Sequence, residues 1–268
     1  MTGLPPLLLV GAGRMGAAML AGWREQGLAP SVAVDPAPAA AALAGPDLTV
    51  VADPGAIPPG FAPAAVVFAV KPQSAAATLP AYARFVGQAG FLSIMAGRTL
   101  GGIRALLGEA ASVIRAMPNT PAAIRQGISV ACPGPGVTAS QRALAERLLG
   151  AIGEVAFVAD EALLDPVTAV SGSGPAYVFL LAELLEREAA AQGIPPELAR
   201  RLARRTVAGS GALLAASAED AAALRVAVTS PAGTTEAALG VLMAPHAWPE
   251  AMARAIAAAT RRSRELAG

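Results

Sequence analysis

The sequence predicts an α/β protein in which a doubly wound, mostly parallel sheet is followed by an all-helical C-terminal domain. Two observations support this fold class. Residues 1 to about 160 alternate short apolar runs with helical stretches, and after Asp160 only helical patterns remain. Near-continuous apolar strands that alternate with helices are typical of a parallel sheet with helices on both faces. We therefore expect two domains, residues 1–160 and 161–268.

The predicted strands are short apolar runs separated by helical stretches. They cover residues 7–10, 32–35, 48–51, 65–70, 91–95, 113–116, 128–131 and 155–158. The helical patterns of the second half cover about residues 162–170, 175–192, 196–216, 219–228, 235–243 and 247–266. The helix at 175–192 has a broad apolar face that includes Val178, Leu181 and Leu185. Such a face needs a partner, which we expect to be another subunit.

Composition narrows the class of protein. The chain has 268 residues, a hydrophobic fraction of 54% and a formal net charge of +1, which gives no general reason to expect a nucleic-acid partner. No uncharged run reaches the roughly 18 residues of a membrane-spanning helix, and no signal peptide is evident, so we expect a cytoplasmic protein without a membrane partner. The single cysteine, Cys132, excludes an intrachain disulfide and a cysteine-based zinc site, and we expect no metal.

The first predicted strand leads directly into GAGRMG, a glycine-rich motif before a helix. Gly11 permits a tight turn, Gly13 lets a pyrophosphate approach the backbone, and Gly16 lets the helix pack on the strand. The helix start offers unpaired amides to the phosphates, and Arg14 and Met15 belong to the same expected contact. The motif predicts dinucleotide binding by a Rossmann-type domain, and the simpler alternative is a structural glycine turn.

Asp35 ends the next strand and bears on the choice of cofactor. A carboxylate at this position bonds the ribose hydroxyls of the adenosine and repels a 2′-phosphate, which favours NAD. Arg14 is the nearby cation that could accept that phosphate. The two residues act in opposite directions, so the sequence leaves NADP and NAD both open. Replacement of Asp35 by Ser is expected to shift the preference toward NADPH.

Three further motifs, AVKPQ, SIMAG and MPNTPA, end predicted strands at the edge where doubly wound sheets bind ligands. Lys71 in AVKPQ is placed to meet a cofactor phosphate, a ribose or another anionic group; the alternative is a loop lysine in solvent. The small residues of SIMAG let a backbone pass close to a nicotinamide. Asn119 in MPNTPA has two alternatives, an Asx turn and a ligand contact. The cofactor contacts expected from the first two motifs are Ala69, Val70, Lys71, Pro72, Ala96 and Gly97.

The stretch TSPAGTTEAAL interrupts the helices of the second half with hydroxylated and helix-breaking residues. Pro231 and Gly233 bend the chain, and we expect Thr234 or Thr235 to cap a helix that starts near Glu236. The exposed amides of that helix start would form an anion pocket. The alternative is that the hydroxyls only cap the helix.

Taken in order, GAGRMG, AVKPQ, MPNTPA, AVSGSGPAYVF and TSPAGTTEAAL closely resemble the motifs of the pyrroline-5-carboxylate reductase family. The resemblance covers essentially the whole chain, and the last two motifs are specific to that family. It implies a helical C-terminal dimerisation domain, and a homodimer or a higher homo-oligomer such as a decamer. It also implies NAD(P)H-dependent reduction of 1-pyrroline-5-carboxylate to L-proline, the final step of proline biosynthesis, by hydride transfer to the cyclic imine.

The substrate contacts follow from this resemblance and from the loop chemistry. Ser230, Gly233 and Thr234 are expected to bind the substrate carboxylate. The resemblance puts Thr235 near the ring nitrogen, as hydrogen-bond partner and proton relay. One departure concerns the adenosine: many family members have an asparagine after the third strand, whereas residues 47–67 contain none.

Two other functions share parts of this pattern. Hydroxyacid dehydrogenases of the same two-domain build usually place a lysine and an asparagine together on a second-domain helix, but this chain has no lysine after Lys71 and no asparagine after Asn119. A reductase that acts on related cyclic imines fits the residues more closely. A non-catalytic nucleotide sensor would not need the substrate loop.

Overall fold

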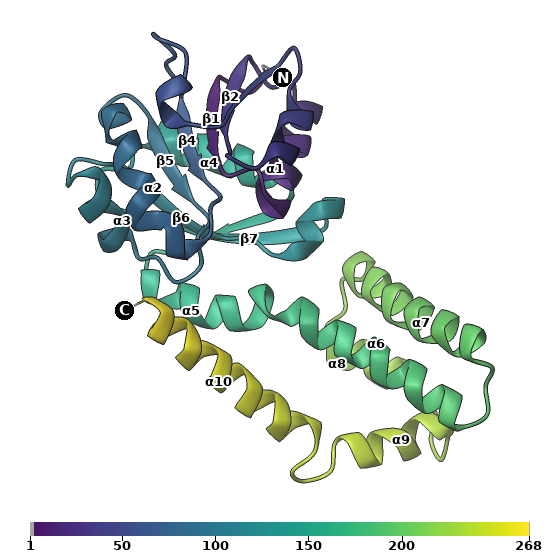
Figure 1. The fold of residues 1–268 in the computed structure, drawn as a ribbon. Helices are drawn as coiled ribbons and strands as arrows, with labels where there is room; N and C mark the ends of the chain where they lie inside the picture. The colour runs from purple at the N-terminus through teal and green to yellow at the C-terminus, as the bar shows by residue number, and fades with distance from the viewer. Residues whose placement is uncertain (1–2, 268) are drawn as a thin grey trace. The chain divides into compact units, whose positions relative to one another are not determined.

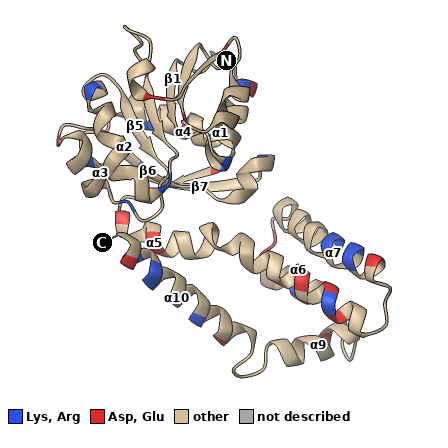
Figure 2. Ribbon diagram, viewed as in Figure 1, with Lys and Arg blue, Asp and Glu red and all other residues tan. Residues whose placement is uncertain are grey.

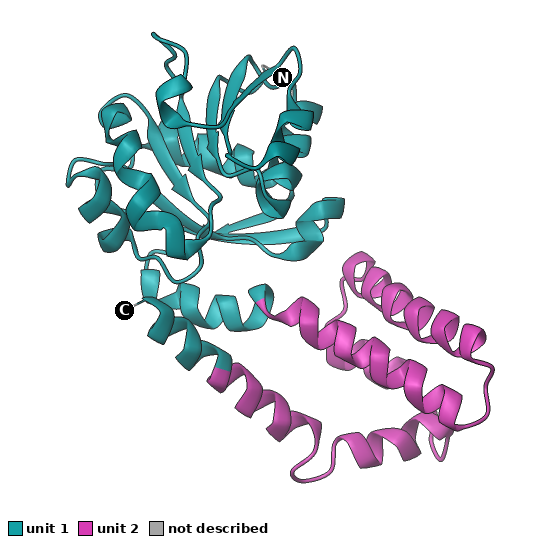
Figure 3. Cartoon of the chain, viewed as in Figure 1, with its two compact units in different colours: residues 1–172, 259–268 teal, residues 173–258 magenta. Residues whose placement is uncertain are grey.

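The computed structural model describes residues 3–267 and divides the chain into two compact units (Figures 1 and 3). The sheet unit runs to Gly172 and includes the chain from Ala259 onward, and the helical unit is Ser173–Ala258. The sheet unit therefore extends beyond the boundary predicted near residue 160. The physical reason is that Leu164 is fully buried in a core of the sheet unit, although the strand pattern has already ended.

The sheet confirms the predicted α/β class. Its strands within residues 3–267 are β1 (Leu7–Val10), β2 (Ser31–Val34), β3 (Leu48–Val51), β4 (Ala65–Phe68), β5 (Gly90–Ser93), β6 (Val113–Met117), β7 (Gly127–Pro133) and β8 (Gly153–Phe157). They lie in the order β3-β2-β1-β4-β5-β6-β7-β8, and neighbours are parallel except for β6 and β7. Each predicted apolar run therefore forms a strand within a few residues of its expected bounds.

Both faces of the sheet are buried, since successive side chains of a strand point to opposite faces. Leu8 belongs to one core and Leu9 to the other. The helices of this unit are α1 (Arg14–Glu25), α2 (Ala75–Thr78), α3 (Leu100–Leu107), α4 (Ala139–Gly150) and α5 (Leu164–Val167). The first core includes residues of α2 and α3, and the second includes residues of α1 and α4. Trp23 of α1 donates a hydrogen bond to the carbonyl oxygen of Leu148 in α4 at 2.9 Å.

Short turns complete the sheet unit. Six are 3₁₀ turns: η1 (Pro38–Leu43), η2 (Pro54–Ala56), η3 (Pro72–Ser74), η4 (Leu79–Phe85), η5 (Thr120–Ile124) and η6 (Glu161–Leu163) within the described residues. A π-helical turn, η7 (Thr168–Gly172), follows α5. Proline occupies an early position in η1 to η5, where its missing N–H costs no hydrogen bond.

The helical unit exposes most of its apolar surface. Its helices are α6 (Gly174–Ala191), α7 (Pro196–Ala216), α8 (Ala221–Ala227), α9 (Thr234–Leu242) and the first part of α10 (Trp248–Ala267). Among the described residues of this unit, only Ala199 and Ala203 are buried hydrophobic residues, whereas Phe179 is 67% and Val241 71% exposed. Since burial of apolar area stabilises a fold by about 25 cal/mol per Å², this unit needs a partner surface.

One helical stretch is apolar enough to cross a membrane by length and composition. It covers Glu161–Ala191, with a mean hydropathy of 1.3 over a window of which 6% is buried. Within α6, the charged residues lie only in its later part, whereas Glu161 and Asp165 precede this helix (Figure 2). This finding differs from the expectation of no spanning helix, because that expectation was based on uncharged runs alone. A single such helix is weak support for a membrane span, because core helices of soluble proteins pass the same test.

Candidate active site

A cavity of about 720 Å³ lies at the carboxyl edge of the sheet, beside the point where the strand order reverses between β1 and β4. Doubly wound sheets bind their ligands at such a switch point. Residues that follow β1, β2, β3 and β4 line it. They are Val10, Gly11, Gly13, Val34, Asp35, Pro36, Ala37, Ala52, Pro54, Ala69, Val70, Lys71, Gln73, Ser74, Ala77, Thr78, Ala81 and Tyr82.

The three glycines of the first loop occupy different environments. Gly11 has a φ of +92°, and a methyl group there would lie 2.9 Å from the backbone of Ala69. A methyl group on Gly16 would lie 2.2 Å from the carbonyl oxygen of Gly11, so α1 approaches the loop closely. A methyl group on Gly13 would meet no atom within 4 Å, which leaves its backbone open to a ligand. These surroundings fit a bound dinucleotide, and the pyrophosphate contact itself stays a prediction.

Asp35 fastens the glycine loop to the end of β2. Its carboxylate accepts a hydrogen bond from the amide of Ala12 at 2.6 Å and another from the amide of Ala37 at 2.8 Å. A carboxylate has about four lone-pair sites, so ribose hydroxyls can still bond to it. Asp35 therefore has a structural role that its position in the sequence did not reveal.

Not every predicted cofactor residue lines this cavity. Arg14 is exposed at the start of α1, and Met15 is half-buried and packs against the second core. Pro72 begins η3 beside the exposed Lys71. Ala96 is exposed and Gly97 is buried, and both lie outside the lining residues. Their loop is nevertheless joined to the Lys71 loop, because Arg98 donates a hydrogen bond to the carbonyl oxygen of Pro72 at 2.9 Å.

The opposite wall of the cavity was not predicted. It contains Ala52 and Pro54 after β3, and Thr78 and Tyr82 from α2 and η4. Ala52 and Pro54 belong to residues 47–67, the segment in which many family members are expected to carry an asparagine. The Tyr82 hydroxyl is buried without a hydrogen-bond partner in residues 3–267, and burial raises its pKa. The topology of the sheet could have predicted the residues after β3, because β3 is parallel to β2 and ends at the same edge of the sheet.

Asn119 has a structural partner. Its side-chain oxygen accepts a hydrogen bond from the amide of Ile128 at 2.9 Å, which ties the MPNTPA segment to β7. This bond spans a longer turn than an Asx turn. Asn119 therefore has a structural role other than the predicted Asx turn, and the ligand contact stays a prediction.

The predicted substrate loop lies between α8 and α9 in the helical unit. The prediction that Thr234 or Thr235 caps a helix starting near Glu236 is wrong, because α9 begins at Thr234 and its N-cap is Gly233. The extended Gly233 starts the helix earlier, after a turn in which its amide bonds the carbonyl oxygen of Ser230 at 3.0 Å. The Glu236 carboxylate accepts the amide of Ala232 at 2.6 Å.

The hydroxyls of this loop are available to a ligand. Ser230 and Thr234 are exposed and Thr235 is half-buried. None of their side chains has a hydrogen-bond partner within the described part of the chain, and no N-cap side chain bonds the first amides of α9, because its N-cap is a glycine. The first turn of α9 therefore presents unpaired N–H groups, as an anion site requires. The Glu236 charge in the same turn opposes an anion and limits its affinity.

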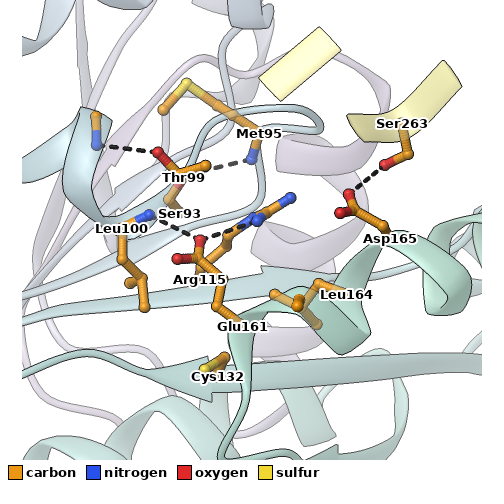
Figure 4. A network of polar contacts seen from close by, with 12 residues as sticks. Ser93, Met95, Thr99, Leu100, Arg115, Cys132, Glu161, Leu164, Asp165 and Ser263 are labelled. Atoms are coloured by element: carbon orange, nitrogen blue, oxygen red, sulfur yellow. Dashed lines mark hydrogen bonds and ion pairs between the residues drawn. The ribbon is translucent and has the colours of Figure 1, made fainter. Parts of the chain in front are cut away.

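A buried ion pair lies beneath the loop after β5 (Figure 4). Arg115 of β6 is 5% exposed and donates a hydrogen bond to Glu161 at 2.9 Å. The same Glu161 oxygen accepts the amide of Leu100 at 2.8 Å. This pair was not predicted, because the run that forms β6 resembles an ordinary apolar strand and Glu161 lies 46 residues away in the chain.

Known proteins resemble this chain along its whole length. A family model described as pyrroline-5-carboxylate reductase dimerisation matches residues 161–266. The pyrroline-5-carboxylate reductase of Pseudomonas aeruginosa is 39% identical over 267 residues, which cover 98% of this chain and 97% of that relative. The chain belongs to the pyrroline-5-carboxylate reductase family. The resemblance inferred from its motifs is thereby confirmed.

Further relatives and solved structures of this family agree. The pyrroline-5-carboxylate reductase of Arabidopsis thaliana is 38% identical over 202 residues, which cover 75% of this chain and 72% of the relative. A pyrroline-5-carboxylate reductase structure from Coxiella burnetii matches with a TM-score of 0.89 at 30% identity, covering 98% of this chain and 99% of that chain. A Plasmodium falciparum pyrroline carboxylate reductase with NADP bound has a TM-score of 0.83 at 24% identity, covers 98% of both chains, and supports the fold alone.

Proposed function

We propose that this chain catalyses the NAD(P)H-dependent reduction of 1-pyrroline-5-carboxylate to L-proline, the final step of proline biosynthesis. The observation that carries this proposal is 39% identity to a pyrroline-5-carboxylate reductase along 98% of the chain. The cavity at the switch point of the sheet supports it independently, since it offers a glycine loop and a helix start to a dinucleotide.

The nicotinamide cofactor is held by the sheet unit in this proposal. Gly13 leaves room for the pyrophosphate, and Gly11 and Gly16 shape the loop around it. Asp35 and Arg14 act in opposite directions on a 2′-phosphate, so kinetics with both cofactors decide the preference. The related malarial enzyme was solved with NADP bound.

The helical unit supplies the substrate contacts. Ser230, Gly233 and Thr234 hold the carboxylate through hydroxyls and unpaired amides at the start of α9. Thr235 bonds the ring nitrogen and relays the proton that this nitrogen gains. The bound reduced cofactor supplies the hydride that adds to the imine carbon. Orientation of the reactants can lower such a barrier by several kcal/mol, up to roughly 7–11 in the best intramolecular cases.

A homodimer or a larger homo-oligomer would bury the apolar faces that the helical unit exposes. An apolar groove of about 310 Å³ runs between α6 and α10, with Leu181, Leu184, Trp248 and Met252 in its lining. The dimerisation family model spans these same helices. We place a second copy there and the protein in the cytoplasm. Light scattering of the purified protein tests the oligomer, and a monomer would contradict it. Fractionation of cells tests the location, and recovery in a membrane fraction would contradict it.

One assay tests the proposed reaction. Purified protein with 1-pyrroline-5-carboxylate and either NADPH or NADH should consume the cofactor and form L-proline, measured by nicotinamide absorbance and amino-acid analysis. Related cyclic imines serve as control substrates and should be reduced with lower kcat/KM. Absence of consumption with both cofactors would reject the reductase assignment.

A further inference from the structure

We propose, on the basis of the function above, that residues 263–266 of α10 position the loop that follows β5. We name these residues the C-terminal turn, and residues 94–99 the β5–α3 loop. This loop is the one expected beside the nicotinamide, through Ala96 and Gly97. The C-terminal turn is a positioning element in this proposal, because it touches the loop rather than the cofactor.

The first contact is made directly on Gly97. This residue is buried and has a φ of +67°. A methyl group added to it would lie 3.0 Å from both the Cβ and the carbonyl oxygen of Leu266. Leu266 itself is 54% exposed, so its backbone and Cβ cover Gly97 while the rest of its side chain reaches solvent.

The second contact anchors the turn to the sheet unit. Ser263 is 6% exposed and donates a hydrogen bond to the Asp165 carboxylate at 2.7 Å (Figure 4). Arg264 lies 4.0 Å from the other oxygen of Asp165. Asp165 follows Leu164, which is fully buried in the first core. The C-terminal turn is therefore held by a charge-assisted bond to a rigid part of the same unit.

The end of the β5–α3 loop nearest α3 is already fixed by other residues. Thr99 caps α3, and the amide of Leu100 is bonded to Glu161, which pairs with the buried Arg115. Arg98 is bonded to the carbonyl oxygen of Pro72. Ala96 and Gly97 lie between these anchors and β5, and the contact that we find for this part of the loop is the one with Leu266. Loss of the C-terminal turn should loosen this part of the loop.

The test uses two ligands that differ only at the nicotinamide end. NADPH carries the nicotinamide riboside, whereas 2′-phospho-ADP-ribose lacks the nicotinamide ring; NADH and ADP-ribose form the same pair without the phosphate. Two variants remove the contacts: Ser263→Ala, and a chain that ends at Arg264. Two matched controls keep them. Glu265→Ala removes only an exposed ion pair with Arg262, and Leu266→Ala retains the Cβ and carbonyl oxygen that cover Gly97.

We expect Ser263→Ala to bind NADPH and NADH about tenfold more weakly, as the loss of a charge-assisted hydrogen bond predicts. The chain that ends at Arg264 keeps that bond but loses the cover that Leu266 gives to Gly97, and we expect it to bind both cofactors more weakly as well. Binding of 2′-phospho-ADP-ribose and ADP-ribose should stay near wild type, and both controls should bind all ligands normally. Amide hydrogen exchange in residues 94–99 should accelerate in the disrupting variants alone. A general structural role would weaken both ligands of a pair alike, and this result would overturn the proposal.

Unchanged binding and exchange in both disrupting variants would overturn it as well. These measurements need no turnover, so their outcome is separate from the reductase assay. A wild-type protein that binds NADPH but does not reduce pyrroline-5-carboxylate would refute the proposed function and leave the positioning role standing.

Discussion

The glycine loop allows a paired test of its geometry, with Gly13→Ala and Gly16→Ala as the two changes. The backbone at Gly13 has φ −65° and ψ −171°, values that alanine adopts without strain, and its added methyl group would meet no atom within 4 Å. Alanine also restricts the unfolded chain, so Gly13→Ala should stabilise the ligand-free protein by about 0.4–1 kcal/mol. The methyl group would instead occupy the space expected for the pyrophosphate.

The expected loss in cofactor affinity follows from overpacking. An inserted methyl group in a close-packed contact costs about 1–3 kcal/mol, which corresponds to about 5- to 150-fold weaker binding. In Gly16→Ala the methyl group would lie 2.2 Å from the Gly11 carbonyl oxygen, so α1 or the loop must move even without a ligand. Gly16→Ala should therefore lose about 3 kcal/mol of folding stability and unfold several degrees lower.

Thermal unfolding without ligand and dissociation constants for NADPH and NADH separate the two effects. Gly13→Ala should lose affinity and keep its stability, whereas Gly16→Ala should lose both. Wild-type affinity of Gly13→Ala for both cofactors would refute a pyrophosphate at this backbone. Wild-type stability of Gly16→Ala would refute the close packing of α1 on the loop.

Four further predictions follow from individual side chains. Asp35→Ser should raise kcat/KM for NADPH relative to NADH, because it removes a repulsion of about 1–2 kcal/mol toward the 2′-phosphate; an unchanged ratio in steady-state kinetics excludes this role. Thr235→Ala should lower turnover about 10- to 100-fold with an unchanged circular dichroism spectrum, as expected for a lost proton relay, and wild-type kinetics would remove it from the mechanism. Hydrogen bonds from Arg24 lower the pKa of Asp47, so this contribution is present above the unfolded carboxyl pKa of about 3.9 and is lost as pH falls through the lower folded value. Asp47→Asn should therefore cost up to about 1 kcal/mol near pH 7 and nothing in strong acid, measured by urea unfolding at each pH. Burial raises the pKa of Cys132, so iodoacetamide should label it only after unfolding, and rapid labelling of the native protein would contradict its burial.

The central strands β1, β2 and β4 were predictable because they are buried on both faces, which leaves an uninterrupted apolar run in the sequence. Leu7 and Leu8 point into different cores, yet both are apolar, so the run marks a central strand without any knowledge of its neighbours. The mostly parallel, doubly wound character of the sheet followed from the alternation of strands and helices, whereas the order of the strands came from the structure. The antiparallel placement of β7 beside β6 did not follow from the sequence, since no local signal records it.

The site was predictable wherever a motif combines position with an unusual residue type. Gly11, Gly13, Asp35 and Lys71 line one cavity because each follows a strand that ends at the same edge. The wall formed by Ala52, Thr78 and Tyr82 was missed, because small and aromatic residues after a strand are too common to stand out. The start of α9 was misplaced by two residues, since the glycine that precedes the threonines is as good an N-cap as they are.

The sequence by itself determined the fold class, the position of the glycine-rich loop after the first strand, and the family. These properties depend on periodicity and on short motifs, which are local along the chain. Only the tertiary structure showed that Asp35 holds the Ala12 amide, that Arg115 pairs with Glu161, and that α10 ends against Gly97 in the sheet unit. Each of these contacts joins residues that are distant in sequence, and any of several polar or small partners could have satisfied them. The physical reason is that the type of a side chain shows which kind of hydrogen-bond, charge or packing partner it requires. The packing of the whole chain determines which residue is that partner.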